Sequence, residues 1–187
     1  MTPPNITFTR HDPSSTERVL DSVIVPVYEA SHADVIHNPF YSSERFAERV
    51  RGYLKSTGFE IVVAYVDDHP VGQAFGYALS TTTRWWQGLT PPGPEGFSKE
   101  TGSRTFAFNE LMVVPERQGK GVAHALHDEL LNGRREERAT LLVREDNTSA
   151  RNAYDRWGWE KIGKLQPYPD APHFVAMIIK LPLNRSE

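Results

Sequence analysis

Apolar positions along the chain follow two spacings, the two-residue spacing of strands and the three-to-four-residue spacing of helices. Residues 6–10 alternate and predict a first edge strand. Two β-rich runs, residues 59–67 and 71–80, flank the compact turn Asp-Asp-His-Pro and predict a hairpin. Four further strands are expected at residues 106–114, 139–143, 160–165 and 173–181.

Helices are predicted where the apolar spacing lengthens. Ser14 and Glu17 form a capping box before an apolar stripe that runs to residue 27, although Pro26 should kink or split this helix. A second helix should begin at Ser42 or Ser43 and run to about residue 55. Two more helices are expected at residues 122–131 and 148–157.

Composition is that of a soluble globular protein and suits a single domain over residues 1–187, with 39% hydrophobic and 24% charged residues. The net charge is −3 and the chain has no long Lys/Arg runs, so the sequence does not indicate a nucleic-acid-binding surface. Zero cysteines exclude disulfides, thiolate metal sites and a cysteine nucleophile. No apolar run approaches the ~20 residues of a membrane helix, so we expect a cytoplasmic protein without a membrane partner.

The stretch Gln118-Gly119-Lys120-Gly121 lies between the strand at residues 106–114 and the helix that follows. Glycines let a phosphate approach the backbone, and the first N–H groups of a helix have no intrahelical partner. A P-loop is excluded, because it requires Ser or Thr after the lysine and Lys120 is followed by Gly121. A dinucleotide-binding fingerprint is excluded as well, because it requires a third small residue where this chain has His124. The pattern therefore indicates a diphosphate site, with a simple tight turn as the alternative.

Two segments together resemble the GNAT superfamily of acyl-CoA N-acyltransferases. Gln118, Gly121 and Ala123 fit its acetyl-CoA signature [Q/R]-x-x-G-x-[G/A], and residues 145–159 resemble its second motif, N-x-x-A-x-x-x-Y-x-x-x-G-[F/W]. The resemblance is carried by residues 105–164. It implies a GNAT-like fold of the α/β (α+β mixed) class: a central mixed, mostly antiparallel sheet of about seven strands flanked by about four helices.

The resemblance also implies acetyl-CoA as co-substrate. Strand backbone groups would bind its pantetheine arm, the glycine turn its diphosphate, and Asn147 the pantetheine, although a plain helix N-cap explains Asn147 almost as well. The expected cofactor-binding residues are Met112, Val113, Val114, Gln118, Gly119, Lys120, Gly121, Val122, Ala123, Asn147 and Ala150.

Acyl transfer to an amine needs a base, a polarised carbonyl and a proton for the departing thiolate. Glu110, on the strand that enters the signature, is the candidate base; the alternative is a carboxylate paired to an arginine such as Arg104. Tyr154 is the candidate acid by the resemblance, and otherwise a core tyrosine. Without a cysteine nucleophile, we expect direct attack in a ternary complex.

The acceptor is predicted to be a primary amine of a small molecule. The long connection at residues 81–102 carries Trp85 and Trp86, which either line the acceptor pocket or pin the loop to the body or a partner subunit. Tyr28 and Glu29 are further candidates for residues that bind the acceptor. A protein N-terminus or lysine as acceptor, a non-catalytic CoA- or amine-binding sensor, and a homodimer all stay open.

His124 and His127 lie three residues apart on the helix after the glycine turn. Two imidazoles at this spacing could begin a metal site, but no third ligand is evident nearby. We interpret the pair as part of a solvated helix face and expect no metal cofactor.

Overall fold

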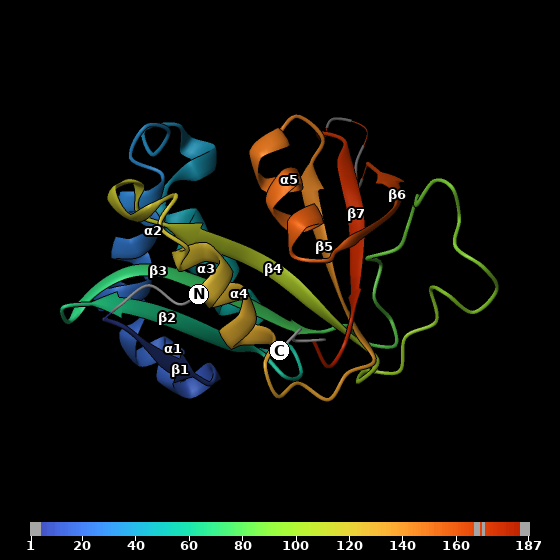
Figure 1. Cartoon of the computed structure of the whole chain (residues 1–187), viewed down its shortest axis with the longest axis horizontal. Helices are drawn as coiled ribbons and strands as arrows, with labels where there is room; N and C mark the ends of the chain where they lie inside the picture. Colours follow the sequence, from blue (N-terminus) through green and yellow to red (C-terminus); the bar gives the residue numbers. More distant parts are fainter. Residues whose placement is uncertain (1–4, 167–168, 170, 184–187) are drawn as a thin grey trace. The chain divides into compact units, whose positions relative to one another are not determined.

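The computed structural model describes residues 5–166, 169 and 171–183 (Figure 1). Seven strands of these residues form one sheet in the order β1-β2-β3-β4-β5-β7-β6. The chain divides into two compact units: the first comprises residues 1–77 and 109–132, and the second residues 78–108 and 133–187.

The first unit contains an antiparallel ladder. β1 (Ile6–His11) pairs with β2 (Glu60–Val66), and β2 pairs with β3 (His69–Ala78), so the predicted hairpin is confirmed. Both turn residues of the hairpin, Asp67 and Asp68, have positive φ angles of 50° and 62°. Aspartate tolerates this left-handed region better than most residues, which explains why the turn is so short.

The helices of the first unit begin with an irregular segment. α1 (Pro13–Val19), a π-helical turn (Leu20–Ile24) and α2 (Val25–Ser31) follow one another without a break. The predicted capping box at Ser14 is wrong, because Asp12 caps α1 by accepting the Ser15 N–H at 2.8 Å. A capping residue must precede the first helical residue, and Pro13 occupies that first position.

Two regular helices complete this unit. α3 (Ser43–Tyr53) begins at the Ser42 cap, within the range predicted from sequence, and α4 (Val122–Leu131) follows the glycine turn. Since α1–α2 form one interrupted helix, the described residues contain four helical segments beside the short 3-10 turns, once α5 of the second unit is included.

The core of the first unit lies between the first three helices and the hairpin. Its fully buried side chains include Leu20, Ile24, Phe46, Ile61 and Phe75. Burying each such side chain stabilises the fold by about 1.5–3 kcal/mol. The same packing holds the second half of α2 and the first turns of α3 in fixed positions.

Gly72 of β3 lies against both β4 and α4. A Cβ atom at this position would lie 2.8 Å from the Met112 carbonyl oxygen and 3.0 Å from Leu126. Only glycine allows β4 and α4 to approach β3 this closely. The packing fixes the strand end and the helix start on either side of the glycine turn.

The second unit holds the remaining strands and α5. β4 (Thr105–Val113) begins here and pairs in parallel with β5 (Arg138–Arg144) from Thr105↔Arg138 to Ala107↔Thr140. β7 (Phe174–Lys180) pairs antiparallel with both β5 and β6 (Glu160–Leu165). The sheet is thus mixed and mostly antiparallel, which confirms the predicted fold class.

The connection at residues 81–104 contains turns and bends but no helix or strand (Figure 1). Thr90 and Lys164 exchange two backbone hydrogen bonds of 2.8 and 2.9 Å, which fasten this connection to β6. Among the described residues, no helix combines the length and apolar character needed to span a membrane.

Candidate active site

The carboxylate of Glu110 lies beside the guanidinium of Arg49. Nη2 of Arg49, in α3, is 3.7 Å from Oε1 of Glu110, in β4. The Glu110 side chain keeps 24% of its surface exposed, so protein atoms cover most of it and solvent reaches the rest. Its arginine partner is therefore Arg49, whereas Arg104 of the second unit pairs with Glu137 at 3.2 Å.

Two opposing effects set the pKa of Glu110. Burial raises this pKa, because a carboxylate loses hydration when the protein encloses it. The positive charge of Arg49 lowers the pKa, since it favours the ionised form. The net result is a raised pKa, which makes Glu110 a stronger base than an ordinary exposed carboxylate.

Aromatic rings form a wall next to this pair. Tyr28 is 1% exposed, and its ring lies parallel to that of Phe46 at 3.9 Å and to that of His32 at 4.2 Å. The Tyr28 hydroxyl donates to the Tyr41 carbonyl oxygen at 3.0 Å. This bond fixes the short 3-10 turn Pro39–Tyr41, whose other end is capped by the Asn38 side chain.

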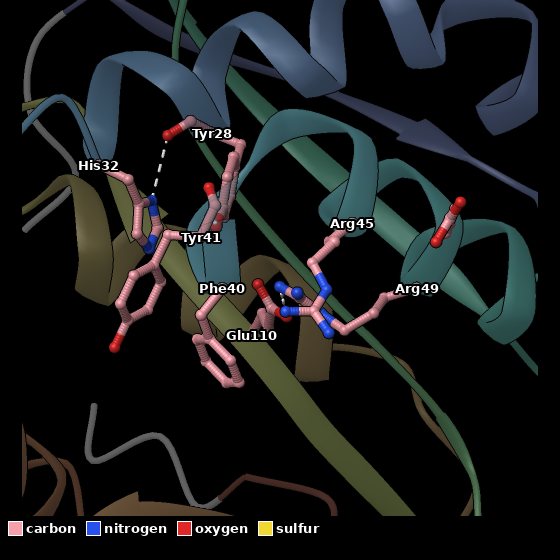
Figure 2. A pocket seen from close by; sticks show the side chains of 8 residues that line it. Tyr28, His32, Phe40, Tyr41, Arg45, Arg49 and Glu110 are labelled. Carbon is pink, nitrogen blue, oxygen red and sulfur yellow. Dashed lines mark hydrogen bonds and ion pairs between the residues drawn. The ribbon is translucent and has the colours of Figure 1, made fainter. Parts of the chain in front are cut away.

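These groups line one pocket of about 640 Å³ within the first unit (Figure 2). That volume falls in the range of small-molecule sites. Its lining residues are Tyr28, His32, Phe40, Tyr41, Arg45, Glu48, Arg49 and Glu110. In Figure 2 the Arg45 and Arg49 side chains reach toward Glu110 from α3, with the Phe40 ring beside them.

Burial also changes the pKa values of two aromatic side chains of the pocket. It raises the pKa of Tyr28, against the opposing effect of the nearby Arg49. It lowers the pKa of His32, against a hydrogen bond to the Tyr28 carbonyl oxygen. Both groups are thus neutral at pH 7, and the charges of the pocket come from its arginines and carboxylates.

The glycine turn has the backbone geometry expected of an anion site. Gly119 and Gly121 have φ angles of 69° and 81°, in the left-handed region that favours glycine. Gly121 precedes α4 and no side chain caps the helix; its first backbone bond runs from the Ala125 N–H to the Gly121 carbonyl oxygen at 3.0 Å. The N–H groups of Val122 and Ala123 therefore point out of the helix start.

Hydrogen bonds at the end of β4 distinguish the backbone groups of Val113 and Val114. The Val114 N–H donates to Val71 of β3 at 2.9 Å, and the Val114 carbonyl accepts from Arg117. The Gln118 side chain donates to the Val113 carbonyl oxygen at 3.0 Å. Because successive residues of a strand direct their amides to opposite sides, the Val113 N–H points away from β3. Met112 is buried beneath this segment.

Tyr154 lies on the partly buried face of α5 (Thr148–Arg156), in the second unit. Its ring contacts Trp157 edge-on at 5.5 Å and Trp159 at 6.0 Å. Burial raises the pKa of Tyr154 to about 12, so the phenol keeps its proton at neutral pH. Asn147 caps α5 by accepting the Ala150 N–H at 3.1 Å, which leaves the side-chain amide NH2 group of Asn147 to donate elsewhere.

The two tryptophans of the long connection have different surroundings. Trp86 is 7% exposed, and its indole N–H donates to Glu100 at 2.9 Å. Its ring also contacts Phe97 at 5.1 Å, so Trp86 anchors the connection within its own unit. Trp85 is half-buried, and its indole nitrogen is buried without a hydrogen-bond partner in the described residues. Neither is among the residues that line the pocket around Glu110.

Two residues near the end of α2, Tyr28 and Glu29, were predicted to bind the acceptor, and one of them lies in the pocket. Tyr28 lines it, as described above. Glu29 is exposed and accepts a hydrogen bond from the Ser43 hydroxyl at 2.6 Å, a contact that joins α2 to α3 outside the pocket lining.

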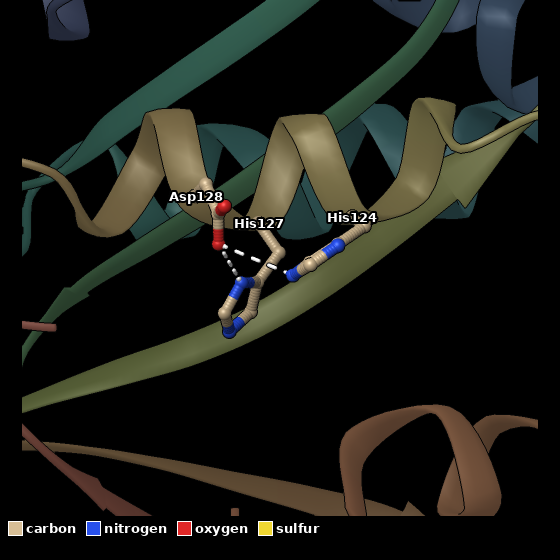
Figure 3. A group of neighbouring side chains, drawn as sticks. All are labelled: His124, His127 and Asp128. Carbon is tan, nitrogen blue, oxygen red and sulfur yellow. Dashed lines mark hydrogen bonds and ion pairs between the residues drawn. The ribbon is translucent and has the colours of Figure 1, made fainter. Parts of the chain in front are cut away.

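His124, His127 and Asp128 form a compact group on α4 (Figure 3). Asp128 Oδ1 lies 2.8 Å from His127 Nδ1 and 3.6 Å from His124 Nε2. The expectation of a solvated face is wrong for His127, which is 1% exposed and shares the buried side of α4 with Leu126 and Leu130. A third potential metal ligand is also present, because Asp128 follows His127 directly.

The pocket residues that the sequence did not single out include Phe40, Tyr41, Arg45, Glu48 and Arg49. The spacing of Arg45 and Arg49, four residues apart on one helix, places them on one face of α3. That signal alone could not reveal the carboxylate that this face meets.

Comparison with known proteins identifies the family. The pattern of the family described as "Acetyltransferase (GNAT) family" matches residues 27–159. The chain therefore belongs to the GNAT acetyltransferase family, a family of acyltransferases.

One relative by sequence is a GCN5-like protein acetyltransferase of Mycobacterium tuberculosis. It is 31% identical over 117 residues, which are 58% of this chain and 56% of that protein. The chain thus spans about half the length of the curated relative it matches.

Solved structures share the fold. A protein of Pyrococcus horikoshii superposes with a TM-score of 0.67 at 21% identity, over 94% of this chain and 98% of that chain. A GNAT family acetyltransferase of Elizabethkingia anophelis, solved with acetyl-CoA bound, has a TM-score of 0.62 at 13% identity, over 95% and 99% of the two chains. At these identities the likeness concerns the fold.

Proposed function

We propose that this protein is an N-acetyltransferase that transfers the acetyl group of acetyl-CoA to a primary amine of a small molecule by direct attack in a ternary complex. The observation that carries the proposal is the Glu110 carboxylate, which burial makes more basic and which lies in a small-molecule-sized pocket. Membership of the GNAT family supports acetyl-CoA as the donor.

The cofactor would be held mainly by backbone groups. The left-handed Gly119 and Gly121 and the N–H groups at the start of α4 suit its diphosphate. The remaining residues proposed for the cofactor are Met112, Val113, Val114, Gln118, Lys120, Val122, Ala123, Asn147 and Ala150. Of the strand amides, the Val113 N–H is our candidate for the bond to the thioester carbonyl, because the Val114 N–H is bonded to Val71.

Glu110 would act as the base. Alkyl amines are mostly protonated near neutral pH, so the ammonium group must lose a proton before its nitrogen can attack. Glu110 accepts this proton directly or through water. Arg49 favours the ionised form of Glu110, because its charge opposes the rise in pKa that burial causes.

Tyr154 would assist the departing thiolate. When the amine nitrogen bonds to the carbonyl carbon, the oxygen gains charge; when the carbon–sulfur bond breaks, the electron pair leaves with sulfur. A phenol with a pKa of about 12 is protonated at this moment and donates to the sulfur. The acetylated nitrogen releases its remaining extra proton to water, and the Tyr154 phenolate takes a proton back from water, which leaves CoA thiol and the acetylated amine as products.

A protein amine is the second candidate acceptor. It is favoured by the relative of Mycobacterium tuberculosis, whose name describes a protein acetyltransferase and which is 31% identical over 117 residues. The volume of the pocket and the aromatic wall beside Glu110 favour a small molecule instead.

Calorimetric titration with acetyl-CoA, followed by thiol release over a panel of amines and peptides, tests the proposal. We expect acetyl-CoA to bind and thiol to be released with at least one amine. Glu110→Gln should lower kcat/KM by about 10²-fold or more, as for loss of a general base. Binding without thiol release on a broad panel would favour a sensor role, and absence of binding would refute the cofactor site.

A further inference from the structure

The lining of the acceptor pocket carries charges of both signs. Arg45 and Arg49 provide two cations, and Glu48 and Glu110 provide two carboxylates. The lowered pKa of His32 keeps its imidazole neutral at pH 7. The lining is therefore formally neutral, with both signs present, which suits a ligand that itself carries both signs.

The two arginines differ in their contacts. Arg49 is engaged with Glu110 at 3.7 Å and approaches Tyr28. For Arg45, the described residues provide no carboxylate partner: its guanidinium lies 5.8 Å from the centre of the Phe40 ring. A guanidinium presents a planar fork of N–H donors that matches a carboxylate. Arg45 thus offers the pocket a cation without a protein counter-ion.

Phe40 supplies the apolar side of the pocket. Its ring is 61% exposed and, within the described part of the chain, it is the large hydrophobic side chain left at the surface. The ring is held outward by the 3-10 turn that Asn38 caps and Tyr28 fastens through Tyr41. Because Phe40 lines the pocket, its exposed face is available to an apolar part of a ligand.

We infer that the acceptor is an amine with an anionic group close to its nitrogen and an apolar or aromatic body, as in the amino carboxylates. This inference rests on the proposed function, because it takes the amine to lie at Glu110. The anionic group would bind Arg45, with Arg49 beside it, and the apolar body would pack on Phe40 and Tyr41.

Charge explains why other amines fit less well. A polyamine brings only positive charges to a lining that is formally neutral, and it offers no anion to Arg45. A simple arylalkylamine fills the aromatic wall and leaves Arg45 without an anion. An amino carboxylate satisfies both ends of the pocket.

Matched ligands test this inference without depending on catalysis. N-acetyl-L-phenylalanine and N-acetyl-L-phenylalaninamide differ only in the anionic group, and their binding is measured by calorimetry on the whole protein. We expect the carboxylate to bind roughly tenfold tighter or more, since hydrogen bonds to charged groups contribute this much. Arg45→Gln should remove most of the difference. Arg51→Gln is the control, because Arg51 lies on the same helix and pairs with Glu17 outside this pocket.

Thiol release with L-phenylalanine, L-phenylalaninamide and spermidine then separates the two proposals. Preference for L-phenylalanine supports both. Carboxylate-dependent binding without thiol release supports the anion subsite and refutes the transferase. Preference of the active enzyme for spermidine or the amide, with equal binding of the two N-acetyl compounds, supports the transferase and overturns this inference. A short peptide whose second residue is aspartate also carries an anion near its N-terminal amine. Thiol release with this peptide and not with L-phenylalanine would show that the acceptor is a peptide rather than a free amino acid.

Discussion

Arg49 in α3 and Glu110 in β4 form an ion pair at 3.7 Å in a pocket walled by aromatic rings. The pair joins two segments far apart in the chain, the helix that follows the 3-10 turn and the strand that enters the glycine signature. Burial raises the pKa of Glu110 and Arg49 limits that rise, so the two together set the pH range in which this carboxylate can accept a proton.

Replacing Arg49 should shift the pH dependence of activity. Arg49 lowers the pKa of Glu110, so Arg49→Met should raise this pKa further and move the acidic limb of the kcat/KM profile to higher pH. A shift of about one pH unit is expected for loss of a neighbouring arginine. Arg51→Met, on the same helix but paired with Glu17, should leave the limb in place. An unmoved limb in Arg49→Met would mean that Glu110 is not the titrating base.

Glu110→Gln should stabilise the protein while it lowers activity. A carboxyl group whose pKa is raised on folding favours the folded state when protonated, so its contribution to stability is present at low pH and lost as pH rises through the folded pKa. Thermal unfolding should therefore give Glu110→Gln a higher Tm than the parent protein at pH 8. The difference in Tm between the two proteins should disappear near pH 4. Glu48→Gln, at an exposed carboxylate of the same pocket, should change stability by less than about 0.5 kcal/mol. A lower Tm for Glu110→Gln at pH 8 would show that the Arg49 contact outweighs burial.

Tyr154→Phe should separate cofactor binding from transfer. The change removes only the phenolic hydroxyl, so the affinity for acetyl-CoA measured by calorimetry should stay within about threefold. Loss of a general acid typically costs about 10²-fold or more in kcat. Tyr53→Phe is a suitable control, because Tyr53 packs against Tyr77 and is not among the residues that line the pocket around Glu110. Undiminished turnover in Tyr154→Phe would remove the residue from the mechanism.

Two glycine substitutions should have opposite effects on stability. A Cβ added at Gly119 or at Gly52 would meet nothing within 4 Å, but Gly119 has a φ of 69° whereas Gly52 lies within α3. Gly119→Ala should therefore destabilise the protein by about 1–2 kcal/mol through backbone strain. Gly52→Ala should stabilise it by about 0.4–1 kcal/mol. Chemical denaturation of both variants measures the pair, and an equal effect of the two would show that the backbone at Gly119 is not left-handed.

Much of the fold follows from local sequence. Three local features predict elements of the structure: the alternation of residues 59–80 around a two-aspartate turn predicts the hairpin, the Ser42 and Asn147 caps predict the starts of two helices, and the glycines of the signature predict a turn. Each acts through neighbouring backbone atoms. Even so, local reasoning failed where two capping residues competed: Asp12 rather than Ser14 caps α1, because Pro13 already begins the helix.

The site depended on tertiary structure. The sequence by itself determined the family motifs and made Glu110 a candidate base, but it could not show which arginine meets this carboxylate, since α3 and β4 are brought together only by the packing of the core. The same packing determines that His127 turns inward on α4 and that Phe40 stays exposed at a pocket. Helical spacing gives the residues that share a face; which face is buried, and against which charge, is decided by the whole folded chain.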